Sequence, residues 1–273
     1  VSIIYLSPVA NLFLKFRNLI FDRSGGIFLQ NPLSHFKLQI QDIDWRSLLP
    51  NAFLMMCCWS YVPFAYAIQI KTTVFSHDLY SLFAYQICIA LAATIIFDQQ
   101  GGSLTSIIPL LISFLFAISG FLHGNVFLFI LLLLPPCYLL IFELYLHEFQ
   151  NPVGLLVFGL LMTLSIPVAF TFISVKFLSW SYLLKLVPLL MIYCFYYAPL
   201  FLSDDPRFPM IEGGLGVILI LTMLTRPIKA TLLLAIALVI LSWWLLQRLV
   251  ANPHNQIFYT LLQLLTTILI FWV

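Results

Sequence analysis

Charged side chains are scarce in this sequence. Lysine, arginine, aspartate and glutamate together make up only 8% of its 273 residues, and apolar residues make up 63%. Soluble domains are about one quarter charged. The composition therefore excludes a water-soluble globular protein and predicts a membrane protein with many spanning segments and the lipid bilayer as its main partner. The formal net charge of +2 is too small to indicate a nucleic-acid partner.

Familiar catalytic motifs are also missing. The chain has no glycine-rich phosphate loop, no nucleophile elbow and no HExxH zinc motif. Its five cysteines lie inside apolar runs, and none has CxxC spacing. We interpret them as packing residues rather than as redox or metal-binding groups. No cofactor is evident from these patterns, and the apolar runs leave no room for a soluble catalytic domain.

Long uncharged runs are what the chain has instead. The clearest is 127–142, FLFILLLLPPCYLLIF, which contains no charged residue. A hydrocarbon core of about 30 Å demands roughly 20 apolar residues in each helix. Most of the predicted spans reach that length, and they are 50–70, 79–98, 104–122, 125–146, 153–174, 179–201, 212–226, 228–249 and 255–273.

The segment 212–226 is the exception among these spans. It begins with Glu212-Gly213-Gly214 and stops at Thr225-Arg226-Pro227, with about fifteen suitable residues. A short span, a re-entrant half-helix and a broken helix all fit this pattern. The sequence therefore predicts an all-α, polytopic bundle of about 8–9 transmembrane helices.

The first 48 residues are the most polar part of the chain. Phe36, Ile40, Ile43 and Trp45 line one side of a helix, which predicts an N-terminal amphipathic helix lying on the membrane surface. A strand-like alternation at Phe36, Leu38 and Ile40 is the alternative. We expect two parts, an interfacial or cytoplasmic segment 1–48 and a transmembrane helical domain 49–273.

Basic residues near span ends indicate the orientation. Five of them precede the first span, which places the N-terminus in the cytoplasm. Nine full spans would put Lys176, Lys185, Arg226 and Lys229 on the outside, whereas a re-entrant 212–226 returns Arg226 and Lys229 to the cytoplasm. The expected location is a bacterial inner membrane or an organellar membrane.

Four residues are candidates for a polar transport path. Glu143 and His147 are four apart, so one helix would place them on the same face, and an intramembrane ionisable residue suggests function. Lys176 and Lys185 would carry protons if buried, because desolvation lowers the pKa of a lysine. The alternatives are a polar cluster meeting headgroups for the first pair and snorkelling for the lysines. The segment Leu164–Lys176 resembles the proline-broken, lysine-bearing helices of antiporter-like subunits of respiratory complexes.

Three aspartates support a different reading. Asp98 ends the second predicted span, and Asp204 and Asp205 end the sixth, so both loops would lie on the cytoplasmic face and could hold Mg²⁺ against a diphosphate. Here the chain resembles the intramembrane prenyltransferases, which carry aspartate-rich motifs after their second and sixth helices. Those motifs space several aspartates at helical intervals, whereas this chain has FDQQGG and SDDPRF.

Three functions therefore remain open from the sequence. The first is a transporter or permease-type subunit, alone or within a larger complex of membrane subunits. The second is an intramembrane enzyme that modifies a lipid or isoprenoid with Mg²⁺. The third is a non-catalytic accessory or assembly subunit. Short loops, proline-broken helices and sparse intramembrane charge favour the first.

Overall fold

The computed structural model describes residues 45–70, 77–99, 104–122, 126–202, 205–249 and 256–272. All of these residues belong to one compact unit, Leu38–Val273. The amphipathic surface helix predicted within residues 1–48 lies outside the described part of the chain, and residues 45–48 already belong to the first described helix. The division of the chain after residue 48 stays a prediction.

The described elements are all α-helices, and no strand occurs among the described residues. In chain order they are α2 (Trp45–Gln69), α3 (His77–Asp98), α4 (Leu104–Leu122), α5 (Val126–Leu144), α6 (Leu146–Phe149), α7 (Pro152–Leu164), α8 (Ile166–Val175), α9 (Trp180–Lys185), α10 (Val187–Leu202), α11 (Phe208–Met223), α12 (Ala230–Leu249) and α13 (Gln256–Ile270). The all-helical prediction is confirmed for these residues.

Six described helical segments are long and apolar enough to cross a bilayer. They are Trp45–Gln69, Leu79–Asp98, Val126–Leu144, Pro152–Val175, Trp180–Leu202 and Ala230–Gln247. Three shorter apolar helices accompany them, at Thr105–Ile118, Phe208–Met223 and Gln256–Ile270. The multi-pass class follows from the six long segments, while a total of eight or nine spans stays a prediction that depends on the shorter helices.

Prolines divide two of the predicted spans. A proline lacks the backbone N–H of a helical hydrogen bond, and its ring crowds the preceding turn. The span predicted at 153–174 is accordingly two helices, α7 and α8, with Pro167 in the first turn of α8. The span predicted at 179–201 is α9 followed by α10, which carries Pro188 in its first turn. Both interruptions fall where the sequence places a proline.

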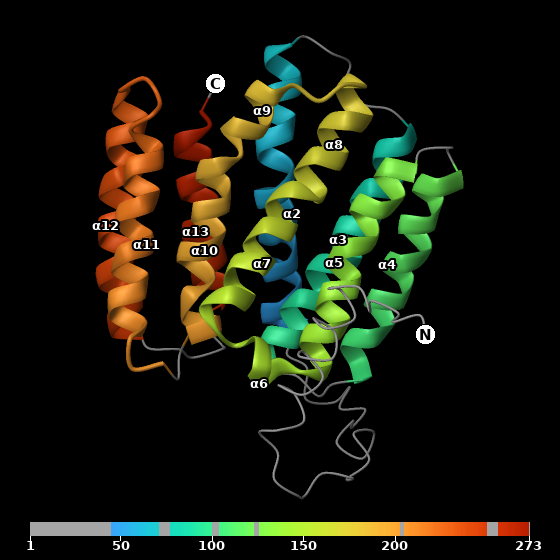
Figure 1. The fold of residues 1–273 in the computed structure, drawn as a ribbon, viewed down its shortest axis with the longest axis horizontal. Helices are drawn as coiled ribbons and strands as arrows, with labels where there is room; N and C mark the ends of the chain where they lie inside the picture. Colours follow the sequence, from blue (N-terminus) through green and yellow to red (C-terminus); the bar gives the residue numbers. More distant parts are fainter. Residues whose placement is uncertain are drawn as a thin grey trace, which may run out of the picture. The chain divides into compact units, whose positions relative to one another are not determined.

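The ends of α10 define the two ends of the described bundle (Figure 1). At its start, the Arg226 guanidinium donates to the Lys185 carbonyl at 3.0 Å. In its last turn, the ring of Phe201 packs with its centroid 5.6 Å from that of Phe97 and 5.2 Å from that of Phe142. Helix α13 runs antiparallel to α10 and ends beside Arg226. We call these the Arg226 end and the Phe201 end.

Gly154 is required where α6 meets α7. The Asn151 side chain caps α7 by accepting from the Gly154 N–H at 2.8 Å, and the Tyr138 hydroxyl donates to the Gly154 carbonyl at 2.9 Å. A Cβ atom at residue 154 would collide with the carbonyl oxygen of Phe149, which is a backbone atom. The backbone would have to shift to admit any side chain.

We therefore expect Gly154→Ala to lower the free energy of unfolding by about 1–3 kcal/mol, the usual cost of overpacking. The matched control is Gly214→Ala in α11, because a Cβ there meets nothing within 4 Å. Thermal unfolding of the detergent-solubilised protein measures both. Equal unfolding temperatures for the two variants would show that the α6–α7 junction is not tightly packed.

Candidate functional site

Helix α13 buries its polar side chains and exposes only apolar ones. Gln256, Thr260, Gln263, Thr266 and Thr267 recur at helical spacing and therefore share a face, and all five are buried. We call them the inner polar face. The exposed large residues of the helix are leucines at positions 261 and 265. A helix on the surface of a soluble protein has the opposite arrangement, whereas a helix with one side toward lipid has this one.

Helix α2 covers part of the inner polar face. The Asn51 amide donates to the Gln256 side-chain oxygen at 2.9 Å, near the Phe201 end. About two turns further along α2, the Cys58 thiol approaches the Thr260 carbonyl at 3.9 Å. The hydrogen bonds from α2 to α13 therefore reach the Gln256 side chain and the Thr260 backbone on the inner polar face.

Helix α10 supplies a tyrosine that links three helices. The Thr266 hydroxyl donates to the Leu262 carbonyl of its own helix at 2.8 Å, so its proton is already committed. The Tyr196 hydroxyl lies 2.6 Å from Thr266 and 3.1 Å from Ser242 of α12. Tyr196 therefore donates to Thr266, and Ser242 donates to Tyr196. This relay of hydroxyl groups crosses the interior from α12 to α13.

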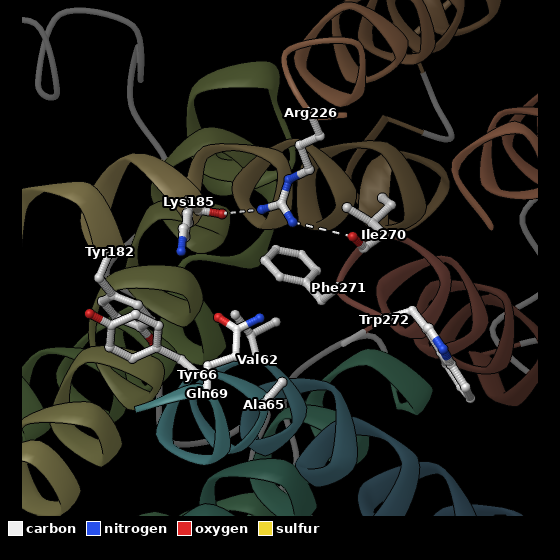
Figure 2. Close-up of a pocket in the computed structure, with 10 residues that line it drawn as sticks. All are labelled: Val62, Ala65, Tyr66, Gln69, Tyr182, Lys185, Arg226, Ile270, Phe271 and Trp272. Carbon is white, nitrogen blue, oxygen red and sulfur yellow. Dashed lines mark hydrogen bonds between the residues drawn. The ribbon is translucent and has the colours of Figure 1, made fainter. Parts of the chain in front are cut away.

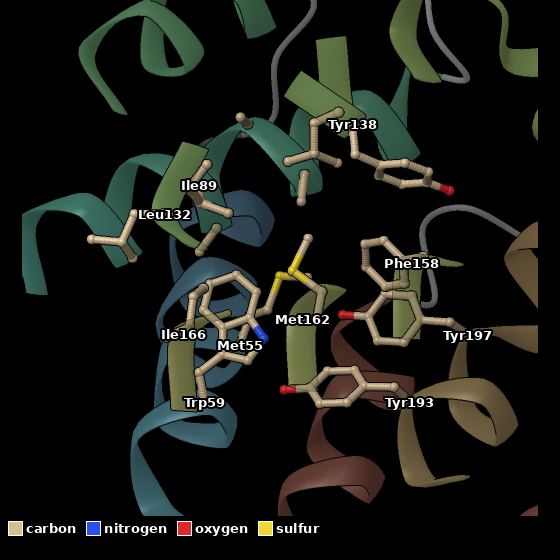
Figure 3. Close-up of a cluster of buried hydrophobic side chains, with 14 of the residues drawn as sticks. Met55, Trp59, Ile89, Leu132, Tyr138, Phe158, Met162, Ile166, Tyr193 and Tyr197 are labelled. Atoms are coloured by element: carbon tan, nitrogen blue, oxygen red, sulfur yellow. The ribbon is translucent and has the colours of Figure 1, made fainter. Parts of the chain in front are cut away.

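Several polar atoms near the inner polar face are buried without a hydrogen-bond partner in the described part of the chain. They include the Gln256 side-chain nitrogen and the Asn51 side-chain oxygen, whereas the Gln263 side chain and the Tyr193 hydroxyl lie within reach of each other. Figure 3 shows the hydroxyl groups of Tyr193 and Tyr197 pointing into the core toward Met162. Leaving such a group unpaired costs about 1–3 kcal/mol. Internal water or a polar solute is the usual way in which proteins meet this need.

A pocket lined by basic residues lies at the Arg226 end. Figure 2 shows Arg226 above the ring of Phe271, bonded to the Lys185 and Ile270 carbonyls. The guanidinium carbon is 4.1 Å from the ring centroid of Phe271. A small cavity of about 90 Å³ lies here, and it shares lining residues with a larger one of about 680 Å³ that also reaches Lys229. We call Lys185, Arg226 and Lys229, with the cavities they line, the basic pocket.

The volume and charge of the basic pocket suit a ligand. The larger cavity falls within the roughly 300–1,000 Å³ that is typical of small-molecule sites. Lys185 also lies over the ring of Tyr66, with its Nζ atom 5.5 Å from the centroid. Partial burial lowers the pKa of the Arg226 guanidinium from its usual value, yet arginine stays protonated at physiological pH. The pocket therefore keeps a positive charge that favours anions.

The structure separates the four predicted path residues. Lys185 lines the basic pocket, whereas Lys176 is exposed and ends α8 in the left-handed conformation with φ 64°. Glu143 is buried in α5 at the Phe201 end, beside Phe142. The helix is interrupted at Tyr145, so Glu143 and His147 are not on one continuous helix. A path function for each stays a prediction, but no single site contains all four.

Of the three predicted Mg²⁺ ligands, Asp98 and Asp205 lie among the described residues, at the ends of helices that meet at the Phe201 end. The contact between Phe97 and Phe201 brings the ends of α3 and α10 together, and Asp98 is the last residue of α3. The Asp205 carboxylate accepts from the Arg207 backbone N–H at 2.8 Å, and Asp204 lies outside the described residues. No group of three His, Cys, Asp or Glu suited to a metal ion occurs among the described residues. The Mg²⁺ site of the enzyme alternative stays a prediction.

The inner polar face was not predicted from the sequence, and Arg226 was predicted only to mark the orientation of the chain in the membrane. The signal was present, since Gln256, Thr260, Gln263 and Thr267 follow one another at intervals of four, three and four residues. Glu212 was not a predicted site residue either, and it lies inside α11 because that helix begins at Phe208. Glu212 is fully buried, and neither carboxylate oxygen has a hydrogen-bond partner in the described residues.

Comparison of the chain with protein-family models, with curated protein sequences and with solved structures found no match. The class of protein is therefore inferred from the fold alone. The chain is a multi-pass, α-helical membrane protein, because six of its described helical segments are long and apolar enough to cross a bilayer.

Proposed function

We propose that the chain is a transport-type membrane protein, either a permease or a membrane subunit of a larger complex. The observation that carries the proposal is the inner polar face, which buries two glutamines and three threonines in the interior of an apolar bundle. Polar residues inside membrane helices are costly and commonly mark substrate or ion pathways. The Gln256 side-chain nitrogen on this face is buried without a hydrogen-bond partner among the described residues, which supports water or a polar solute beside it.

The geometry suits a path that crosses most of the bilayer. Helix α13 has 15 residues, which at 1.5 Å per residue extend about 22 Å. Its first residue bonds to Asn51 near the Phe201 end, and its last residue bonds to Arg226. The inner polar face thus leads toward the basic pocket, where Arg226 and Phe271 cover the end of the helix.

We also propose nine crossings rather than eight with a re-entrant segment. A re-entrant α11 would return to the face from which it started, but Arg207 follows the end of α10 and Arg226 lies at the start of α10. Helix α11 has 16 residues, or about 24 Å of length, and is a short crossing. With the N-terminus in the cytoplasm, the Phe201 end is cytoplasmic and the basic pocket faces the opposite side.

Cysteine labelling of α13 tests the proposed path. In a variant whose five native cysteines are replaced by serine or alanine, Gln263→Cys places a thiol on the inner polar face, and Leu265→Cys places one on the exposed apolar face. A membrane-impermeant thiol reagent reacts with the thiolate, which forms only where water reaches it. We expect Gln263→Cys to react at least about ten times faster than Leu265→Cys, with the reagent added on either side of sealed vesicles.

The same experiment separates the alternatives. No reaction at Gln263→Cys from either side would contradict a path and leave the accessory-subunit alternative. Reaction from one side only would indicate a one-sided pocket, as an enzyme acting on a lipid requires. Reaction at Leu265→Cys as fast as at Gln263→Cys would show that α13 does not have a lipid-facing side.

A further inference from the structure

We propose that the basic pocket is a binding site for a phosphate-bearing anion, presented by an anionic lipid of the surrounding bilayer. The described lining residues include Lys185, Arg226 and Lys229 and no aspartate or glutamate. Three cations that share one cavity without a carboxylate repel one another, and an anion bound between them removes that repulsion. Phosphate is well matched to this set, because arginine and lysine both bind its oxygens strongly.

Arg226 is held ready for such a ligand. A guanidinium has five N–H groups, and the two bonds to the Lys185 and Ile270 carbonyls leave others to donate. Stacking on Phe271 fixes the plane of the guanidinium. Because the side chain is already ordered, binding costs little additional conformational entropy.

The walls of the pocket indicate a lipid rather than a small solute. Trp180 and Trp272 line it and are 75% and 59% exposed, and tryptophan is typical of the level at which lipid headgroups lie. Leu184 lines the same cavity and is also exposed. An amphiphile could place its phosphate among the cations and its acyl chains along these apolar side chains.

This inference does not rest on the transport proposal. It concerns equilibrium binding at the Arg226 end, and it can be measured without any flux. Labelling at Gln263→Cys can fail while lipid binding succeeds, and the reverse result is equally distinguishable.

Titration of the purified, full-length protein with fluorescent phosphatidylglycerol and phosphatidylcholine tests the inference. The test variant combines Lys185→Gln with Lys229→Gln, and Lys176→Gln is the matched control because Lys176 is exposed and does not line the pocket. We expect phosphatidylglycerol to bind more tightly than phosphatidylcholine. The double variant should lose roughly fivefold in affinity for each lysine removed, and the control should bind normally.

Two further measurements make the result decisive. Competition with inorganic phosphate identifies the source of the anion: displacement of the lipid supports a free phosphate, and no displacement supports the lipid headgroup. The charge-preserving variant Lys185→Arg with Lys229→Arg should keep its affinity, which excludes a folding defect as the cause of any loss. Equal binding of the two lipids would overturn the inference, as would an equal loss in Lys176→Gln.

Discussion

Replacing Arg226 with alanine should destabilise the protein by about 2–4 kcal/mol. The guanidinium donates at 3.2 Å to the Ile270 carbonyl, at the end of α13, and at 3.0 Å to the Lys185 carbonyl, at the end of α9. The last carbonyls of a helix have no partner within the helix, so both depend on a donor from outside. Hydrogen bonds from charged donors contribute about 1.5–3 kcal/mol each, reduced here by partial exposure, and the Phe271 contact adds roughly 0.5–1 kcal/mol.

Arg207→Ala is the matched control for this prediction. Arg207 is an exposed arginine at the Phe201 end, and its removal should change the free energy of unfolding by less than about 0.5 kcal/mol. The loss of unfolding free energy in Arg226→Lys should lie between those of Arg226→Ala and Arg207→Ala. Lysine keeps the charge but lacks the planar guanidinium that reaches both carbonyls. Denaturant unfolding in detergent micelles measures all three. Equal free energies of unfolding for Arg226→Ala and Arg207→Ala would contradict the role of Arg226 in holding the ends of α9 and α13 together.

Replacing Gln263 with leucine should make the protein more stable and close the proposed path. The Gln263 side chain has the Tyr193 hydroxyl within reach, which leaves at least one of its buried polar atoms without a partner among the described residues, and an unpaired buried polar group costs about 1–3 kcal/mol. Leucine has a similar volume and no such cost, so we expect a gain of about 1–2 kcal/mol. Stabilisation at the expense of function is common at functional sites.

Thr267→Val provides the opposite case on the same face. The Thr267 hydroxyl donates to the Gln263 carbonyl at 2.8 Å, so valine should cost about 0.5–1.5 kcal/mol. Unfolding measurements on the two variants should therefore give changes of opposite sign. Loss of labelling at Thr260→Cys in the Gln263→Leu background would show that the path has closed. A destabilised Gln263→Leu variant would instead mean that the Gln263 amide is satisfied within the folded protein.

The class of fold could be predicted from the sequence because composition decides it. A chain that is 63% apolar and 8% charged can satisfy its backbone in lipid only with helices or a closed barrel. Each predicted span coincides with a described helix or with a pair of helices interrupted at a proline. Proline-broken helices were predicted, but which prolines interrupt a helix was not, because proline in a membrane helix is also tolerated without a break, as at Pro135 and Pro136.

The candidate site was harder to predict, for two physical reasons. Charged residues are the usual sign of a membrane site, but the inner polar face consists of uncharged amides and hydroxyls spread over about three turns of α13. The basic pocket joins Lys185 to Arg226, which are 41 residues apart, and one sequence contains no information on which helix ends meet. Only Lys185 was a predicted site residue that the pocket contains.

A cryo-electron microscopy map of the protein in a phospholipid nanodisc would test the central claim most directly, if it is sharp enough to show ordered water. We predict water or solute density beside the side chains of Gln263 of α13 and Tyr193 of α10, continuing along the inner polar face toward Arg226. A dry interior, with both polar atoms of Gln263 bonded to protein groups and no density beside them, would contradict the proposed path.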